Sequence, residues 1–366
     1  MTSAAMVSDM ALTDWLDDAD GRDWETATDG SVRFALIGLG WWTVDFAIPA
    51  IERAARCETT VLVSSTAEKA RRIADEHDIP HGISYDAFHE GAAAEDYDAI
   101  YIGTPNARHE AFATTAAALD KAVLCEKPIA ADYEAAERMV EACADVPFMA
   151  AYRMQTDPIV RRARELLRDG IVGEPRYVSG TNAQPLLEMI PDSDQWRLNP
   201  ELTGHGTSVM DLGIYIVNTA RFLLESDPVE ATARMASVDE AFAGVPDQWA
   251  SFSLGFEDGV SLVGTTSQDA QRETRLAITG SEGRLVLDPV FHGEVVMRIE
   301  RGDATATVEH DAVDGHREMY EEFAYFADRM LSGEPIGPDG EHALVDMATL
   351  AAIHEAAERG EPVRIA

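Results

Sequence analysis

Positive charge is what this chain has least of. Its 366 residues include 29 lysines and arginines against 66 aspartates and glutamates, a formal net charge of −37 at pH 7. Such a surface repels nucleic acid and anionic membranes, so we expect neither as a partner. The acidic residues are spread along the chain and aliphatic residues remain plentiful, which argues against disorder. We interpret the charge as a solvated acidic coat, of the kind that suits a cytoplasm rich in salt.

Lysine is the scarcest basic residue. The chain has only Lys69, Lys121 and Lys127 and takes its other positive charges from arginine. A chain that avoids lysine is expected to retain it where arginine cannot substitute, for example where a proton must be lost. Each lysine is therefore a candidate for a specific role.

Cysteines and long apolar runs are also lacking. Cys57, Cys125 and Cys143 form no pair with metal-ligand spacing, and their odd number argues against a disulfide framework. We therefore expect no metal site. No apolar run is long enough to span a membrane, and no basic segment leads into an apolar one at the N-terminus. The sequence predicts a soluble, cytoplasmic protein, and its length predicts two domains.

The first informative motif is a glycine turn after a short apolar run. Residues 32–37 are apolar except for Arg33 and partly β-branched, and Gly38-Leu39-Gly40 follows them directly. This order is typical of a buried parallel strand that meets a helix N-terminus, where backbone amides face the pyrophosphate of a dinucleotide. The third glycine of that fingerprint is replaced by Thr43.

Residues 31–150 alternate short apolar runs with helical patterns. We expect strands at 32–37, 60–63, 98–103, 122–125 and 148–152, with helices between them. This alternation predicts an α/β fold, a doubly wound parallel sheet that binds ligands outside the carboxyl ends of its strands.

The end of the second strand indicates which dinucleotide binds. NAD-binding folds usually carry an acidic residue there, which holds the ribose hydroxyls of adenosine. Here the stretch is Ser64-Ser65-Thr66-Ala67-Glu68-Lys69, with no carboxylate at the tip of the strand. Hydroxyl groups, helix-start amides and a lysine suit a 2′-phosphate, so we predict NADP.

Lys127 is the strongest single candidate for catalysis. It follows the strand at 122–125 and is flanked by Glu126 and Pro128. A lysine can lose its proton when burial and a nearby positive charge lower its pKa. We therefore expect Lys127 to exchange a proton with the substrate.

The pattern changes after residue 150. A helix is expected at 158–168, followed by β runs at 176–181, 229–237, 249–256, 260–266, 275–279, 284–287, 295–300 and 305–309. Tight turns join several of these runs, which predicts an α+β domain with a large, open, mostly antiparallel sheet. Such a sheet can leave one face for a partner subunit.

A second chemical motif lies inside this domain. Asp211 and Tyr215 are four residues apart on an expected helix, after a glycine-rich stretch that contains His205. A carboxylate beside a phenol makes a pair that can handle a proton.

We divide the chain into four parts on this basis. They are an acidic N-terminal arm (1–30), an NADP-binding Rossmann domain (31–150), a substrate and oligomerisation domain (151–335), and a C-terminal helix and tail (336–366). The arm has few apolar anchors, Trp15, Leu16 and Trp24, and it packs either on its own body or on a neighbouring subunit.

Taken together, the motifs resemble those of the Gfo/Idh/MocA oxidoreductases. The resemblance runs from about residue 31 to the end and rests on Gly38-Leu39-Gly40, Thr104-Pro105-Asn106 with His109, Glu126-Lys127-Pro128 and Asp211-Leu212-Gly213-Ile214-Tyr215. Within the family, Ser64 to Lys69, Tyr152-Arg153 and Tyr215 are similar to the aldose-oxidising branch, because inositol dehydrogenases carry histidine in place of Tyr215. The departures are Thr43 and His205, which stands in a usually all-glycine run.

The resemblance implies an oxidoreductase that passes a hydride from C1 of an aldose, D-xylose first, to NADP, with NAD as the weaker alternative. It implies an aldonolactone product, catalytic roles for Lys127, Tyr215 and Asp211, and substrate contacts from Lys127, Tyr152, His205, Asp211 and Tyr215. It also implies a homodimer or homotetramer through the C-terminal sheet, and a C-terminal helix that returns toward the Rossmann domain. The expected cofactor-binding residues are Gly38, Leu39, Gly40, Trp41, Trp42, Ser64, Ser65, Thr66, Lys69, Thr104, Pro105, Asn106, His109, Glu126, Lys127, Arg153, Trp196 and Arg197.

Two alternatives remain open at this point. In the first, the chain oxidises another aldose or a trans-diol. In the second, it binds a dinucleotide as a sensor and catalyses nothing. The presence of Lys127, Asp211 and Tyr215 in a lysine-poor chain favours an enzyme.

Overall fold

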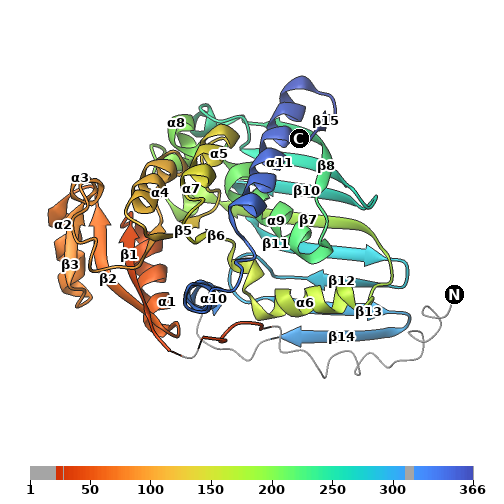
Figure 1. Ribbon diagram of the computed structural model, residues 1–366. Coiled ribbons are helices and arrows are strands. Elements are labelled where there is room, and N and C mark those ends of the chain that lie inside the picture. The colour runs from red at the N-terminus through yellow and green to blue at the C-terminus, as the bar shows by residue number, and fades with distance from the viewer. Residues whose placement is uncertain (1–21, 28, 310–316, 366) are drawn as a thin grey trace.

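Two sheets lie side by side in the computed structural model, which describes residues 22–27, 29–309 and 317–365 (Figure 1). The first sheet has six parallel strands in the order β3-β2-β1-β4-β5-β6, and the second has nine in the order β14-β13-β12-β11-β7-β10-β9-β8-β15. The predicted α/β fold class, a parallel sheet followed by a mostly antiparallel one, is confirmed. The strands of the first sheet are β1 (Val32–Ile37), β2 (Cys57–Ser64), β3 (His81–Ser84), β4 (Ala99–Ile102), β5 (Ala122–Glu126) and β6 (Phe148–Ala151).

Helices cover both faces of the first sheet because both faces of its strands are apolar. In β1, Phe34 and Leu36 face one core cluster, whereas Ala35 and Ile37 face the other. The connecting helices are η3 (Thr43–Ala47), α1 (Ile48–Arg53), α2 (Ala67–Glu76), α3 (Tyr85–His89), η4 (Asn106–Arg108), α4 (His109–Ala118) and α5 (Tyr133–Ala142). The short strand β3 is absent from the sequence prediction, and its four residues are all only half-buried.

Helix α10 (Arg317–Ser332) completes one of these faces, although the sequence analysis counts its residues in the second domain. Phe323 packs against Phe34 of β1 and Tyr101 of β4, with ring centroids 5.5 and 5.3 Å apart. Its buried residues belong to the same core cluster as α1 and α2. The chain therefore returns to the first domain after it has built all but the last strand of the second sheet.

The second sheet carries helices on one face. Its strands are antiparallel except for the parallel pair β7 and β10. Helix α9 packs on β7, α6 on β13 and α11 on β8, and α11 also packs on α5 of the first domain. The elements are η5 (Arg153–Gln155), α6 (Pro158–Arg168), β7 (Pro175–Pro185), α7 (Leu186–Met189), η6 (Trp196–Leu198), α8 (Pro200–Thr203), η7 (Val209–Gly213), α9 (Ile214–Leu224), β8 (Pro228–Ala236), η8 (Glu240–Phe242), β9 (Trp249–Phe256), β10 (Ser261–Ser267), β11 (Asp269–Gly280), β12 (Gly283–Leu287), β13 (Val296–Arg301), β14 (Ala304–Glu309), α11 (Gly340–Arg359) and β15 (Val363–Arg364).

No helix of the described residues covers the other face of the second sheet, and three neighbouring strands, β7, β10 and β9, present uncharged side chains on it. Residues of β9 and β10 alternate between buried and more exposed, so one side of each strand packs on helices and the other side does not. We call the outward residues of these three strands the open face; they are Tyr177, Ser179, Thr181, Trp249, Ser251, Ser253, Ser261, Val263 and Thr265. None of these side chains bears a charge, in a chain with a net charge of −37.

Part of the N-terminal arm docks on its own chain. Trp24 is buried with its ring at a right angle to that of Tyr325 in α10, and the guanidinium of Arg161 in α6 lies 4.8 Å from its centre. Thr26 and the backbone of Ala27 donate hydrogen bonds to Asp328. Residues 22–27 thus pack in cis across α6 and α10, whereas the predicted anchors Trp15 and Leu16 lie outside the described residues.

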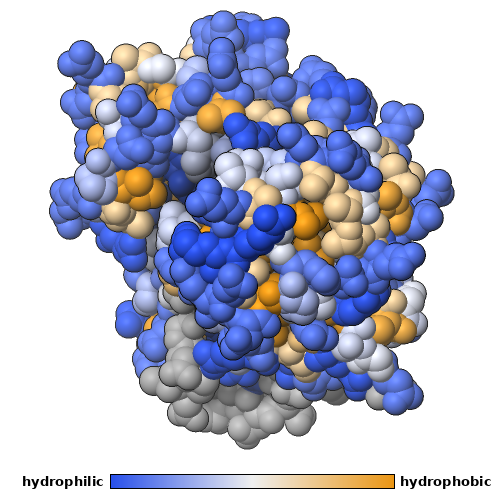
Figure 2. Space-filling model, turned by 90° about the vertical axis from the view of Figure 1, so that its left-hand side faces the viewer, coloured by the Kyte–Doolittle hydropathy of each residue, from blue (hydrophilic) through white to orange (hydrophobic). Residues whose placement is uncertain are grey.

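Hydrophilic side chains cover most of the face in Figure 2, in keeping with the acidic composition. Within the part of the chain that the structure describes, no helix combines the length and the apolar character that a membrane span requires.

Candidate active site

The predicted motifs gather at one edge of the first sheet. Gly38 follows β1 and Thr104 follows the neighbouring strand β4. The chain continues from β1 to β2 on one side of this pair and from β4 to β5 on the other side, and doubly wound sheets bind ligands at such a point. Lys127 follows β5 and Arg153 follows β6. Because parallel strands end at the same edge, four segments far apart in the sequence meet there.

The glycine turn has the shape that a pyrophosphate requires. Gly38 has a φ of +92°, and a Cβ at this position would lie within 2.9 Å of Thr104 and Gly103. Gly40 has no neighbouring atom within 4 Å of the corresponding point, so its backbone faces open space. Thr43, in place of the third glycine, is buried and donates a hydrogen bond of 2.6 Å to the carbonyl of Gly38. Thr43 therefore stabilises the turn through this hydrogen bond.

The end of β2 offers hydroxyl groups and a lysine without a carboxylate. Ser64 is buried, whereas Ser65, Thr66 and Lys69 are exposed. Thr66 is the N-cap of α2, and its hydroxyl accepts a hydrogen bond from the backbone of Lys69. Together with the glycine turn, this donor set fits a dinucleotide with a phosphorylated ribose, although Ser64 itself is less accessible than the sequence predicts.

Lys127 is held at the centre of the site by Asp211. Its Nζ donates to the Asp211 Oδ1 at 3.1 Å and to the Asp211 backbone carbonyl at 2.9 Å. It also lies 4.4 Å from the centre of the Tyr215 ring, within the range of a cation–π interaction. The motif of the first domain and the motif of the second are thereby joined.

Asp211 lies on a π-helical turn, η7, which precedes α9. Such turns displace side chains from regular helical spacing and are frequent at functional sites. Asp211 Oδ2 accepts hydrogen bonds from Arg197 at 2.9 Å and from Gln268 at 3.2 Å. Trp196 lies beneath the guanidinium of Arg197, 4.5 Å from it, so both predicted residues flank the site.

Neighbouring charges determine the direction in which the pKa values of Lys127 and Asp211 are shifted. Burial opposes the charge of Lys127, but Tyr215, Asp211 and Glu126 outweigh it, so the pKa of Lys127 is raised above its usual value. This corrects the expectation of a lowered pKa, which did not include a carboxylate in direct contact. Burial opposes the charge of Asp211 as well, yet Lys127 and Arg197 hold the pKa of Asp211 well below its usual range.

Arg153 supports Tyr215 from the other side. Its Nε donates to the Tyr215 hydroxyl at 3.2 Å, and its other nitrogens donate to Glu318, to the Phe291 carbonyl and to His292 Nδ1. Because arginine can only donate, His292 Nδ1 must accept, so its imidazole is neutral with the proton on Nε2. Burial and Arg153 lower the pKa of His292, which agrees with this state.

Glu126 anchors the aromatic wall beside the glycine turn. Its Oε1 accepts hydrogen bonds from Trp42 Nε1 at 2.9 Å and from the Tyr101 hydroxyl at 2.7 Å. The ring of Trp41 is partly exposed and meets Trp42 edge-on. The guanidinium of Arg153 lies 5.1 Å from the centre of the Trp42 ring, so this wall is continuous with the Lys127 cluster.

Two residues near the turn after β4 are buried and hold neighbouring segments together. Asn106 is buried and donates to the carbonyl of Thr203, and His109 is fully buried between the carbonyls of Thr104 and Pro128. His109 therefore fastens the turns after β4 and β5 together and is not accessible to a ligand. Thr104 has a buried hydroxyl with no hydrogen-bond partner among the described residues, next to Pro105 and the glycine turn.

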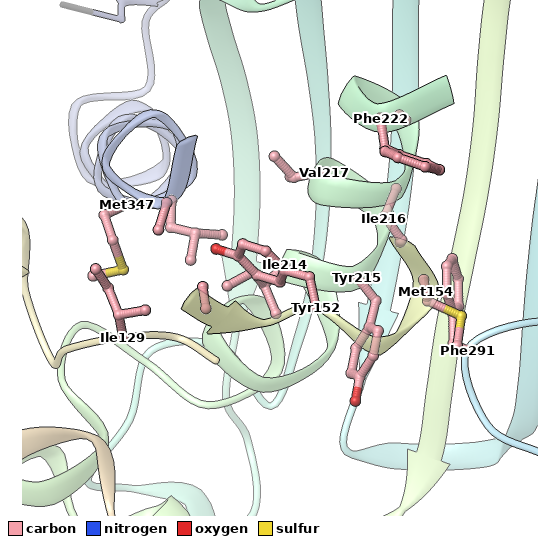
Figure 3. Close-up of a cluster of buried hydrophobic side chains, with 14 of the residues drawn as sticks. Ile129, Tyr152, Met154, Ile214, Tyr215, Ile216, Val217, Phe222, Phe291 and Met347 are labelled. Carbon is pink, nitrogen blue, oxygen red and sulfur yellow. The ribbon is translucent and has the colours of Figure 1, made fainter. Parts of the chain in front are cut away.

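Two predicted substrate residues lie apart from the cluster. The hydroxyls of Tyr152 and Tyr215 point in different directions (Figure 3), and Tyr152 packs on His342 with ring centroids 5.9 Å apart. His205 is exposed and its ring lies 5.6 Å from that of His354 in α11. Tyr152 directly follows β6 and its hydroxyl points away from that of Tyr215 (Figure 3), whereas Arg153 donates to Tyr215, so a substrate contact from Tyr152 stays a prediction.

Sequence reasoning missed Gln268, His292 and Glu318, which contact Asp211 or Arg153. None of them lies in a recognisable motif. The only available signal was a buried polar residue at the end of a strand or in a helix face, and that signal has many other causes.

Comparisons with known proteins agree with this geometry. Residues 32–151 match the family model described as the oxidoreductase family, NAD-binding Rossmann fold, and residues 160–286 match the GFO/IDH/MocA C-terminal domain. The chain is 48% identical to the D-xylose 1-dehydrogenase [NADP(+)] of Haloarcula marismortui, over 94% of this chain and 97% of that one. It is 30% identical to the D-xylose 1-dehydrogenase (NADP(+)) 2 of Haloferax volcanii, over 91% and 100%. The structure superposes on the aldose-aldose oxidoreductase from Caulobacter crescentus, complexed with glycerol, with a TM-score of 0.83, 29% identity and coverage of 91% and 99%.

Proposed function

The chain belongs to the GFO/IDH/MocA oxidoreductase family, and on that basis we propose that it is an NADP-dependent sugar dehydrogenase. Its substrate is an aldose, D-xylose first, which it oxidises at the C1 hydroxyl to the aldonolactone. The relatives from Haloarcula and Haloferax, named as NADP-dependent D-xylose 1-dehydrogenases, support this choice of substrate and cofactor.

One observation carries the proposal: the ammonium of Lys127, held by Asp211, lies against the ring of Tyr215 at the ligand-binding edge of the first sheet. A bound NADP supplies the acceptor for the hydride that leaves C1. The residues of this chain must then accept the proton of the C1 hydroxyl and stabilise charge while the C–H bond breaks.

Tyr215 and Lys127 share the proton in this proposal. Lys127, in its neutral form, first takes the hydroxyl proton of Tyr215. The Tyr215 oxygen then takes the proton of the C1 hydroxyl, and the positive charges of Lys127 and Arg153 stabilise the negative charge that this oxygen bears until it does so. Lys127 finally releases its proton to solvent, so that the site returns to its starting state. Asp211 orients Lys127 and is itself oriented by Arg197 and Gln268.

NADP is held, in this proposal, by the exposed backbone of Gly40 at its pyrophosphate and by Ser65, Thr66 and Lys69 at its 2′-phosphate. Trp41 and Trp42 directly follow Gly40; their rings contact each other, and that of Trp42 also contacts Arg153, which supports Tyr215.

A substrate screen tests the function. We expect NADPH formation in molar salt with D-xylose above other pentoses, hexoses and polyols, and a lower catalytic efficiency with NAD. Turnover of a polyol or a diol in preference to every aldose would show that the substrate is not an aldose. Tight NADP binding without turnover of any sugar would indicate a dinucleotide-binding sensor.

We further propose that the protein is cytoplasmic, salt-adapted and assembled through the open face. The open face is uncharged, so two copies meeting there avoid the repulsion that a charge of −37 imposes elsewhere. Light scattering in molar salt should give a dimer or tetramer, and Val263→Glu should reduce the mass to that of one chain. Dialysis into dilute buffer should lower the melting temperature, because screening of acidic side chains is lost. An unchanged mass in Val263→Glu would place the contact elsewhere.

A further inference from the structure

A second polar cavity lies away from the Lys127 cluster. It has a volume of about 400 Å³ and is bounded by α6, the end of α9, α10 and the segment that leads into α11. Four arginines line it, Arg161, Arg164, Arg221 and Arg329. No residue of the Lys127–Asp211–Tyr215 cluster contributes to its wall, so the two sites are distinct.

Four arginines at one cavity are unexpected in this chain, which has 29 basic residues against 66 acidic ones. Arginine binds phosphate and carboxylate groups through a planar set of donors and is costly to bury without such a partner. Each of the four arginines pairs with at least one carboxylate, and a ligand would compete with the exposed carboxylates among these partners.

The carboxylates that line the cavity, Asp23, Glu225 and Asp227, lie at its rim, whereas Asp346 and Asp328, which pair with Arg221 and Arg329, are buried and do not line it. The side chains of Arg161, Arg221 and Arg329 are 13%, 4% and 8% exposed, whereas those of Asp23 and Asp227 are 65% and 51% exposed. Asp23 pairs with Arg161 and lies 3.6 Å from Arg329, and Glu225 pairs with Arg164. Exposed ion pairs contribute little free energy and are screened by salt, so a bound anion can replace a rim carboxylate at low cost.

Two of the guanidinium groups also retain unused donors. The Nε atoms of Arg164 and Arg329 are buried and have no hydrogen-bond partner among the residues that the structure describes. An unpaired buried donor costs free energy, which a ligand that accepts hydrogen bonds would recover. Burial lowers the pKa of Arg161, and the neighbouring charge of Arg164 adds to this, so the arginines are close enough to repel each other.

The remaining wall is apolar. Phe222, Tyr325, Pro335 and Pro338 line the cavity beside the arginines. The cavity is within the size range of small-molecule sites and is larger than a lone inorganic anion requires. We propose that it binds the phosphate group of a small phosphorylated metabolite, whose organic part packs on this apolar wall.

Calorimetry on the NADP-saturated protein, at constant ionic strength, tests the proposal without reference to activity. The probes are inorganic phosphate and phenyl phosphate; saturation with NADP keeps them from the dinucleotide site, and neither carries a sugar that could enter the proposed aldose site. Phenyl phosphate should bind more tightly, because inorganic phosphate does not reach the apolar wall. Equal affinities would assign the cavity to the free anion and overturn the metabolite part of the proposal.

Arg168 provides a matched control, because it pairs with Glu225 as Arg164 does but does not line the cavity. Arg164→Gln should weaken binding about tenfold or more, the usual effect of losing a charge-assisted hydrogen bond. Arg168→Gln should change it less than about twofold, on the ground that screened surface pairs contribute little. Equal losses of affinity in the two variants would show that only long-range charge attracts the phosphate, and would overturn the assignment of a site to this cavity.

Asp23→Asn gives a test in the opposite direction. It removes the rim carboxylate that competes for Arg161, so phosphate affinity should rise. A destabilised protein does not gain affinity, which separates this result from misfolding. No phosphate binding in the parent protein, or no gain in Asp23→Asn, would overturn the proposal whether or not the chain oxidises an aldose.

Discussion

The Nζ of Lys127 lies 4.4 Å from the centre of the Tyr215 ring, and the same ammonium donates to the carboxylate of Asp211. Lys127 follows a strand of the first sheet, whereas Tyr215 is on a helix of the second domain. The contact therefore exists only when the two domains are packed together. The proposed proton transfer depends on the interface between them.

Lys127→Arg tests whether the lysine must exchange a proton. Arginine keeps the charge, but its guanidinium does not lose a proton at accessible pH. We expect kcat to fall about 10²- to 10⁴-fold, the usual contribution of a positioned acid or base, with a smaller change in NADP affinity. Lys121→Arg is the control, because Lys121 also lies over a tyrosine ring, that of Tyr97, outside the site. Near-parental turnover in Lys127→Arg would remove the lysine from proton transfer.

Asp211→Asn tests the electrostatic coupling through pH. The carboxylate of Asp211 contributes to the raised pKa of Lys127, so its removal lowers that pKa. A rate that depends on the neutral amine rises with pH, and the rising limb should move to lower pH in Asp211→Asn, with a lower maximum. Profiles of kcat against pH for the two proteins give the answer. An unmoved limb would show that another group controls it.

Tyr215→Phe and Tyr152→Phe form a matched pair. Tyr215→Phe keeps the ring beside Lys127 and Arg153 and removes only the hydroxyl, so kcat should fall by about 10² or more while the fold persists. Tyr152 points away from the cluster, and its variant should retain kcat within a few fold. Steady-state kinetics with thermal melts distinguish these outcomes. A larger loss in Tyr152→Phe would contradict the assignment.

Cofactor preference is expected to depend on the exposed residues after β2. Ser65→Asp places a carboxylate where the 2′-phosphate is proposed to lie, which should disfavour NADP and favour NAD. Lys69→Ala should weaken NADP more than NAD, whereas Arg72→Ala, also exposed on α2 but paired with Glu76, should affect both alike. The ratio of kcat/KM for the two cofactors is the measurement. The 2′-phosphate assignment fails if Ser65→Asp and Lys69→Ala both keep the parental ratio.

Asp157 should make stability depend on pH. It is the N-cap of α6, and burial raises its pKa from 3.8 to about 7. The folded chain therefore binds a proton that the unfolded chain has already released between about pH 4 and 7. Stability should fall as the pH rises through this window, by at most about 4 kcal/mol, and level off above it. Denaturant unfolding at several pH values should show a shallower slope in Asp157→Asn, while Asp132→Asn, at the N-cap of α5, serves as the control.

Local patterns carried most of the fold prediction. The helix at Pro158–Arg168 and the strand at Trp249–Phe256 have the bounds that periodicity predicts. Their signals are short in range, since each apolar residue repeats at the spacing of its own element. Helix α10 also has such a stripe, with Met319, Phe323 and Phe326, but a stripe does not say which sheet it covers.

The site was predictable where a motif fixes the backbone. Gly38, Lys127 and Asp211 lie where strand ends and helix starts place them. Tyr152 lies apart from the cluster, because one residue of offset reverses the direction of a side chain at a strand end. The partners of Arg153, Glu318 and His292, come from distant parts of the chain, and only tertiary packing brings them together.

The return of α10 to the first sheet has a consequence for synthesis of the chain. Phe34 and Tyr101 emerge early from the ribosome, yet Phe323, which covers them, emerges after every strand of the second sheet except β15. One face of the nascent first domain thus stays apolar and uncovered while more than half of the polypeptide is still to be made. Folding of the two domains is therefore completed as one late event, and the acidic surface keeps the waiting nascent chains apart.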